Sequence, residues 1–135
     1  MGMTISKMDV RLVPVSKLRP HEEFTEGRLQ ALLKALKETG VLWFPILVDE
    51  KDFIILDGHH RTEAFKRMGL KKILARMVDY ESDEIQVFSR RSDIPITKEI
   101  VRAKVRKGEV FPHKTTRHVY PEQTRHYDVP LEEFK

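Results

Sequence analysis

The sequence contains no cysteine, and this absence excludes several kinds of chemistry at once. Without a thiol there is no disulfide bond, no thiolate metal site and no cysteine nucleophile. Long apolar runs are missing as well: the longest, Phe53–Leu56, is the length of a strand, whereas a membrane-spanning helix needs roughly 20 apolar residues. No apolar segment of the kind found in signal peptides follows Lys7. We therefore expect a soluble, cytoplasmic protein that has no membrane partner.

An excess of one charge sign is also lacking. Of the 135 residues, 25 are lysine or arginine and 21 are aspartate or glutamate, which leaves a net charge of only +4. Such a balance suits a small anionic ligand as well as it suits DNA. The length fits one domain, with or without a C-terminal extension, and a hydrophobic fraction of 40% is enough for one modest core. A charged fraction of 34% in a chain without cysteine is also typical of heat-adapted proteins.

Strand and helix patterns follow one another in mixed order, which indicates a compact α+β domain. Alternating polar and apolar residues predict strands, and apolar residues three or four positions apart predict helices. The predicted strands cover residues 10–15, 45–48, 53–56, 72–78 and 85–88, with a hairpin across residues 49–52. The predicted helices cover residues 28–38, 59–68 and 97–107, each followed by a glycine that can end it. From Glu109 onward the tail is predicted to be irregular.

The most informative segment runs from Phe53 to Arg61. An apolar strand ends at Asp57, Gly58 permits a sharp turn, and a helix begins near His59. The free N–H groups at a helix start favour anions, and a glycine lets a phosphate approach the backbone closely. Arg61 can make a two-pronged contact with phosphate oxygens, and His59 and His60 offer further donors. The segment therefore indicates a phosphate site.

Asp57 is unusual in such a site, because a carboxylate repels phosphate unless it has a separate task. Holding Mg²⁺ or orienting the attacking hydroxyl would be such a task in a phosphotransferase. Asp57 is therefore a candidate catalytic residue and a candidate Mg²⁺ ligand. The spacing fits equally well a plain N-cap at Asp57 followed by a solvated helical turn. Zinc bound by His59 or His60 with Glu63 is disfavoured, because the spacing differs from His-Glu-x-x-His and no thiolate is present.

The motif at Asp57–Arg61, with Ala64 and Gly69–Leu70 after it, resembles the phosphate-binding motif of the ParB/sulfiredoxin superfamily. Within this superfamily the sequence is most similar to the archaeal free-serine kinases, which use ADP or ATP to convert L-serine into O-phosphoserine. Three further segments support this similarity, at residues 19–22, at residues 40–45, and at residues 107–111 together with 114–118. The resemblance extends from about Pro14 to the end of the chain. It departs from some members by lacking a long insertion before residue 107, which leaves nucleotide preference and assembly open.

The resemblance implies a fold, a division of the chain and a reaction. The fold is a compact mixed-sheet ParB/sulfiredoxin-like α+β domain with flanking helices. Residues 1–135 form one kinase domain, with a nucleotide-binding core at about 10–80 and a C-terminal substrate-binding extension at about 81–135. The donor is ATP or ADP with Mg²⁺, the acceptor is L-serine, and the product serves cysteine biosynthesis. The protein is then a monomer or a small homo-oligomer.

The resemblance also implies roles for particular residues. Glu22 matches the catalytic glutamate of the family, although a loop glutamate is by itself usually a solvated charge. Trp43 lies in a segment that the family uses near its pocket, although a lone tryptophan more often belongs to the core, which we favour. The C-terminal segment corresponds to a stretch that binds the substrate, although a basic tail is ordinarily solvated or contacts nucleic acid. This segment comprises Lys114, Thr115, Thr116, Arg117 and His118.

Two other functions compete with the kinase. A sulfiredoxin-like reductase needs a cysteine in the phosphate motif, where this chain has His59, so that function is excluded. A ParB-like nucleotide-binding or DNA-partitioning module shares the motif, but it should continue into a helix-turn-helix domain. Only some 57 residues follow Val78, and they contain one plausible helix. Nucleic acid is therefore disfavoured as a partner, and the kinase is the preferred function.

Overall fold

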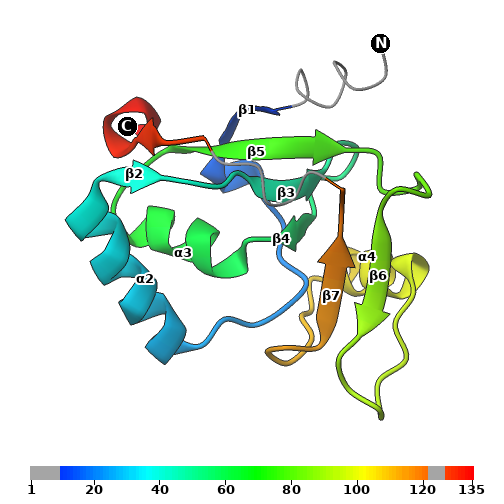
Figure 1. Cartoon of the computed structure of the whole chain (residues 1–135). Helices are drawn as coiled ribbons and strands as arrows, with labels where there is room; N and C mark the ends of the chain where they lie inside the picture. The colour runs from blue at the N-terminus through cyan, green and yellow to red at the C-terminus, as the bar shows by residue number, and fades with distance from the viewer. Residues whose placement is uncertain (1–9, 122–126) are drawn as a thin grey trace.

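A four-stranded mixed sheet lies at the centre of the computed structural model, which describes residues 10–121 and 127–135 (Figure 1). The strand order is β1-β5-β3-β4. The outer strands β1 (Val10–Pro14) and β4 (Ile55–Asp57) pair antiparallel with their neighbours, whereas β3 (Ile46–Asp49) and β5 (Lys72–Val78) pair parallel. The predicted hairpin and the predicted strand at 72–78 are confirmed.

Two helices, α2 (Glu26–Thr39) and α3 (His59–Arg67), pack against each other beneath the sheet (Figure 1). They bury the apolar stripe that the sequence predicts. Gly40 ends α2 in the left-handed conformation, with φ 70°, as a C-terminal glycine does. Both predicted helices are confirmed, and their observed ends lie within two residues of the predicted ones.

The sheet separates two hydrophobic cores, because successive side chains of a strand point to opposite faces. In β3, Ile46 and Val48 join the core that includes α2 and α3, whereas Leu47 joins the other. The second core includes Val101 and Val105 of α4 (Lys98–Arg106), the helix predicted at 97–107. The sequence also predicts a single helix after Val78. This prediction is confirmed, because α4 is the one α-helix among the described residues that follow β5.

The prediction of an irregular tail after Glu109 is wrong. The strand β7 (Thr116–Val119) pairs antiparallel with β6 (Gln86–Ser89), the strand predicted at 85–88. Thr116 and His118 point inward and are buried, while Arg117 is exposed. Buried and exposed side chains therefore alternate along β7, as they do in a strand with one buried face. Because the buried side chains are polar, a search for apolar periodicity misses this strand.

Shorter elements complete the fold. β2 (Val41–Leu42) pairs with β8 (Val129–Pro130), and 3-10 helices occur at η1 (Val15–Lys17) and η2 (Leu131–Phe134). Phe134 is fully buried against Phe65, which attaches the end of the chain to the first core. Across residues 10–121 and 127–135, no helix has the length and apolar character needed to cross a membrane.

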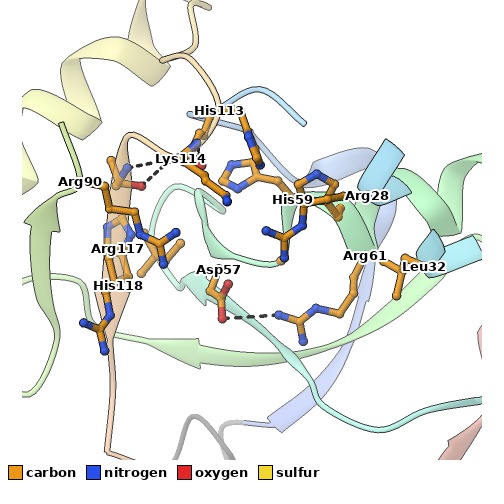
Figure 2. A pocket seen from close by; sticks show the side chains of 15 residues that line it. Arg28, Leu32, Asp57, His59, Arg61, Arg90, His113, Lys114, Arg117 and His118 are labelled. Carbon is orange, nitrogen blue, oxygen red and sulfur yellow. Dashed lines mark hydrogen bonds and ion pairs between the residues drawn. The ribbon is translucent and has the colours of Figure 1, made fainter. Parts of the chain in front are cut away.

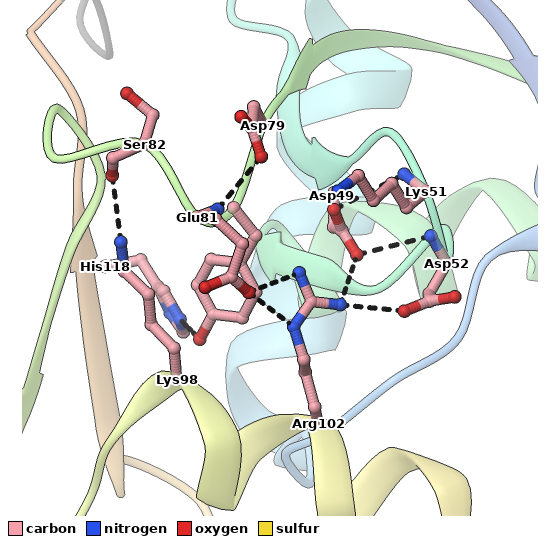
Figure 3. A network of polar contacts seen from close by, with 10 residues as sticks. Asp49, Lys51, Asp52, Asp79, Glu81, Ser82, Lys98, Arg102 and His118 are labelled. Carbon is pink, nitrogen blue, oxygen red and sulfur yellow. Dashed lines mark hydrogen bonds and ion pairs between the residues drawn. The ribbon is translucent and has the colours of Figure 1, made fainter.

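Arg102 joins the C-terminal half to the sheet (Figure 3). Its guanidinium lies 3.2 Å from Asp49, 2.7 Å from Asp52 and 2.9 Å from Glu81. Asp49 is fully buried, so removing Arg102 would leave a buried carboxylate with one partner fewer. This network fixes α4 and the chain after β5 against the β3–β4 hairpin.

Candidate active site

A pocket of about 470 Å³ opens where β4 passes into α3 (Figure 2). β4 ends at Asp57, and Gly58 adopts φ 119° and ψ 26° before α3 begins at His59. A β-carbon at Gly58 would lie 2.3 Å from the Cγ2 atom of Ile46, so the turn requires glycine for space as well as for conformation. All five residues from Asp57 to Arg61 line the pocket.

Glu22 enters the same pocket from the loop before α2. Backbone hydrogen bonds from Glu23 N to Phe111 O and from Phe111 N to His21 O fasten this loop to the C-terminal part. The Glu22 carboxylate accepts hydrogen bonds from the Thr116 N–H at 2.9 Å and hydroxyl at 2.8 Å, and from the Lys114 N–H at 3.1 Å. The predicted catalytic glutamate and the predicted substrate segment are thus in direct contact, although some 90 residues separate them.

His59 and His60 connect the Glu22 loop to the turn at Asp57–Arg61. The backbone N–H of His21 donates to Nε2 of His59, and that of Thr25 donates to Nε2 of His60, both at 3.1 Å. A ring nitrogen that accepts a hydrogen bond carries no proton, so both rings are neutral and protonated at Nδ1. Burial keeps the pKa of His59 well below its ordinary value, and the adjacent His21 and His118 act in the same direction. Each ring can therefore offer only Nδ1–H to a ligand.

Arg61 reaches across the turn and is partly engaged by the protein itself. One terminal nitrogen donates to the carbonyls of Phe44 and Pro45, each at 3.0 Å, and the other lies 3.5 Å from the Asp57 carboxylate (Figure 2). Burial lowers the pKa of Arg61, and the Asp57 charge opposes that shift. Arg61 therefore connects the chain before β3 to the turn. Some of its guanidinium N–H groups remain available to a ligand.

The pocket is strongly cationic, although the whole chain is almost balanced. Five guanidinium or ammonium groups line it, against the two carboxylates of Glu22 and Asp57; the five belong to Arg28, Arg61, Arg90, Lys114 and Arg117. Charges of one sign in a concave site attract ligands of the opposite sign. The pocket is thus suited to a polyanion, and it also contains a carboxylate that can accept a proton.

A family model described as the ParB N-terminal domain matches residues 2–89 of this chain. The chain belongs to the ParB N-terminal domain family. It is 30% identical over 87 residues to the ADP-dependent L-serine kinase of Thermococcus kodakarensis, which covers 62% of this chain and 36% of that protein. It is 38% identical over 80 residues to the ATP-dependent L-serine kinase of Staphylothermus marinus, covering 56% and 32%. The chain spans about a third of the length of these relatives.

A solved structure of a free serine kinase in complex with AMP superposes on this ParB-family chain with a TM-score of 0.86. The match covers 94% of each chain at 20% identity, so it shows a shared fold. The predicted ParB-like α+β fold is confirmed by this likeness and by the family match.

Two of the predicted site residues do not line the pocket. Trp43 does not line the pocket. Its side chain is 47% exposed, so the preferred assignment of Trp43 to the core is wrong, and the neighbouring Leu42 is the buried residue. Thr115 is fully buried, and its hydroxyl donates to the Pro112 carbonyl at 2.6 Å. Lys114, Thr116, Arg117 and His118 do line the pocket.

Three polar pocket residues were missed in the sequence: Arg28, Arg90 and His113. Arg28 is in the first turn of α2, and Arg90 follows directly after β6. Neither has a local signal, because each resembles any exposed arginine next to an element until the chain folds. His113 immediately precedes the predicted segment at 114–118, so extending that segment by one residue would have included it.

Proposed function

We propose that this chain is a nucleotide-dependent kinase that transfers a phosphoryl group from ATP or ADP to the hydroxyl of free L-serine, giving O-phospho-L-serine. One observation carries the proposal: a single pocket combines a glycine turn at a helix start, a set of cationic side chains and the Glu22 carboxylate. The names of the two kinase relatives support the choice of reaction and acceptor.

The donor phosphates would lie on the turn at Gly58–Arg61. The first N–H groups of α3 have no partner within the helix and carry partial positive charge, so they attract phosphate oxygens. The Nδ1–H groups of His59 and His60 and the remaining donors of Arg61 would add side-chain hydrogen bonds to the phosphates. Arg28 and Arg90 add charge from other elements of the pocket wall. Charge stabilisation of this kind supplies much of the rate of phosphoryl transfer.

The acceptor would lie between the turn and β7. Arg117 is exposed in the pocket and can bind the serine carboxylate through a charged, two-pronged contact. Glu22 would take the hydroxyl proton as the acceptor oxygen bonds to phosphorus and the donor's bridging P–O bond breaks. Lys114, Thr116 and His118 would complete the acceptor side. Trp43 and Thr115 receive no contact role, because neither lines the pocket.

Mg²⁺ would bind this site together with the nucleotide, with Asp57 as its protein ligand. Among residues 10–121 and 127–135 there is no group of three or more His, Asp or Glu side chains placed to hold a metal. Mg²⁺ bound with a nucleotide needs only one or two carboxylates, because phosphate oxygens and water supply the rest. Asp57, which is part of the pocket, would hold the ion together with the donor, and the ion would neutralise phosphate charge.

The domain division follows from the same proposal. Residues of about 10–80 contribute the phosphate turn, and residues of about 81–135 contribute the acceptor side, with Glu22 linking the two. Nucleotides and free amino acids are cytoplasmic metabolites, so we expect the protein to act in the cytoplasm. Its product, O-phosphoserine, would serve cysteine biosynthesis.

An end-point assay tests the function. The protein is incubated with Mg²⁺, either ATP or ADP, and L-serine, and O-phosphoserine is followed by phosphorus NMR, with threonine and homoserine as competing acceptors. Phosphoserine formed with either nucleotide supports the proposal.

The family match favours a second candidate, a ParB-like nucleotide-binding or DNA-partitioning module. Nucleotide-dependent, salt-sensitive DNA binding without any phosphoserine would decide for that module instead.

A further inference from the structure

His21 is completely buried beside the active site, and both of its ring nitrogens have partners. Nδ1 lies 2.7 Å from the carbonyl oxygen of Ile55, and Nε2 lies 2.8 Å from the hydroxyl oxygen of Thr116. A carbonyl oxygen can only accept, so Nδ1 must carry a proton. In the neutral ring Nε2 then has a lone pair, and it needs a proton from Thr116.

The Thr116 hydroxyl has only one proton, and two groups compete for it. Its oxygen lies 2.8 Å from Nε2 of His21 and 2.8 Å from Oε1 of Glu22. When Glu22 is a carboxylate, the negative charge makes it the stronger acceptor, so the hydroxyl proton points to Glu22. Nε2 of His21 then faces a lone pair of the hydroxyl oxygen with no proton between them. The chain Glu22–Thr116–His21 is therefore one proton short in this state.

We propose that His21 is a positioning residue for Glu22, acting through the Thr116 hydroxyl to favour the state in which Glu22 has taken up a proton. This proposal rests on the kinase function proposed above. As the acceptor O–H bond breaks, its proton binds Oε1 of Glu22, which donates to Thr116. The Thr116 hydroxyl turns and donates to His21. Each contact in the chain then has one proton, and His21 remains neutral throughout.

The surroundings of His21 support its neutral form. Burial lowers the pKa of His21, while the Glu22 charge and the Ile55 carbonyl oppose that shift. Among the described residues, the titratable side chains next to His21 are Glu22 on its own loop, His59 on α3 and His118 on β7. His59 and His118 are themselves kept neutral by burial, so neither adds charge beside it. Leaving a buried lone pair without a donor is unfavourable, which gives the chain its preference for the extra proton.

Nitrogen-15 NMR of the imidazole rings tests the coupling on the full chain without requiring catalysis. Wild-type His21 is expected to be the neutral Nδ1–H tautomer at neutral pH. Glu22→Gln should allow Nε2 to accept a hydrogen bond that the wild type lacks, because an amide competes less well than a carboxylate for the Thr116 hydroxyl proton. In the Glu22→Gln protein, a further Thr116→Val change should remove that hydrogen bond, whereas Thr116→Ser should keep it. An imidazolium His21 in the wild type, or one Nε2 signal position shared by all four proteins, would overturn the proposal.

Kinetics test the catalytic consequence. Thr116→Val keeps the shape of the side chain and the backbone N–H that contacts Glu22, and it removes only the hydroxyl. We expect kcat to fall about 10-fold, which corresponds to one ordinary hydrogen bond. The KM for nucleotide should not change. Thr116→Ser should recover most of kcat. An unchanged kcat in a folded Thr116→Val protein would overturn the positioning role. If the wild type makes no phosphoserine, the proposed function fails, and the NMR measurements still decide whether Glu22 and His21 are coupled.

Discussion

Gly58→Ala should destabilise the whole domain, because the glycine is required by the fold before any ligand binds. Its φ of 119° is a conformation that residues with a β-carbon rarely adopt, which costs about 1–3 kcal/mol. The new methyl group would also lie 2.3 Å from Cγ2 and 2.7 Å from Cβ of Ile46, a fully buried residue. Overpacking of this kind costs about 1–3 kcal/mol more. We expect a total loss of about 2–6 kcal/mol in the free energy of unfolding.

Urea denaturation measures this loss, and two other glycines provide matched controls. Gly69 has φ 74° and no atom within 4 Å of an added β-carbon, so Gly69→Ala should show the conformational cost alone, about 1–2 kcal/mol. Gly27 lies inside α2 with open space around it, so Gly27→Ala should stabilise slightly. If Gly58→Ala unfolds at the same urea concentration as Gly69→Ala, the contact with Ile46 does not constrain the turn.

Gly58→Ala should also weaken nucleotide binding, but for a different physical reason from the one that the sequence suggests. The sequence suggests that the methyl group would intrude where the backbone meets phosphate. In the structure the added β-carbon meets Ile46 first and Nη2 of Arg61 next, at 3.3 Å. Binding should therefore weaken because the turn and Arg61 are displaced. Calorimetry with nucleotide on the folded fraction measures this effect separately from stability.

Three further predictions concern the pocket. Glu22→Gln should lower kcat about 100-fold or more with the nucleotide Kd retained in calorimetry, and near-normal turnover would remove Glu22 from the chemistry. Arg117→Ala should lower kcat/KM for serine roughly 10- to 150-fold through KM, and an unchanged KM with weaker DNA binding would instead indicate a nucleic-acid contact. Burial lowers the pKa of His21, His59 and His118, so the unfolded chain binds protons more tightly than the folded one. Stability should thus decrease as the pH falls below about 6.5, by up to about 1.4 kcal/mol per pH unit for each histidine; equal urea midpoints at about pH 7.5 and about pH 5 would contradict this.

The sequence by itself determined the elements whose signals are local. The leucines of α2 recur at helical spacing, and Gly40 marks its end, so that helix is visible in one stretch of sequence. The strand–glycine–helix turn at Asp57–Arg61 is likewise a contiguous pattern, and the structure places all five of its residues in one pocket. Glu22 stood out from Glu23 only through the family resemblance, since no local pattern distinguishes the two.

Tertiary structure alone decided which distant residues share the pocket. Arg28 and Arg90 come from separate elements and have no pattern in common, so only the packed fold brings them into the pocket beside the turn at Asp57–Arg61. β7 escaped detection because its inward positions, Thr116 and His118, are polar; they are buried because Glu22, His21 and Tyr80 supply their hydrogen bonds. A buried polar residue is stable only with such partners, and partners 38 to 95 residues away cannot be inferred from local sequence.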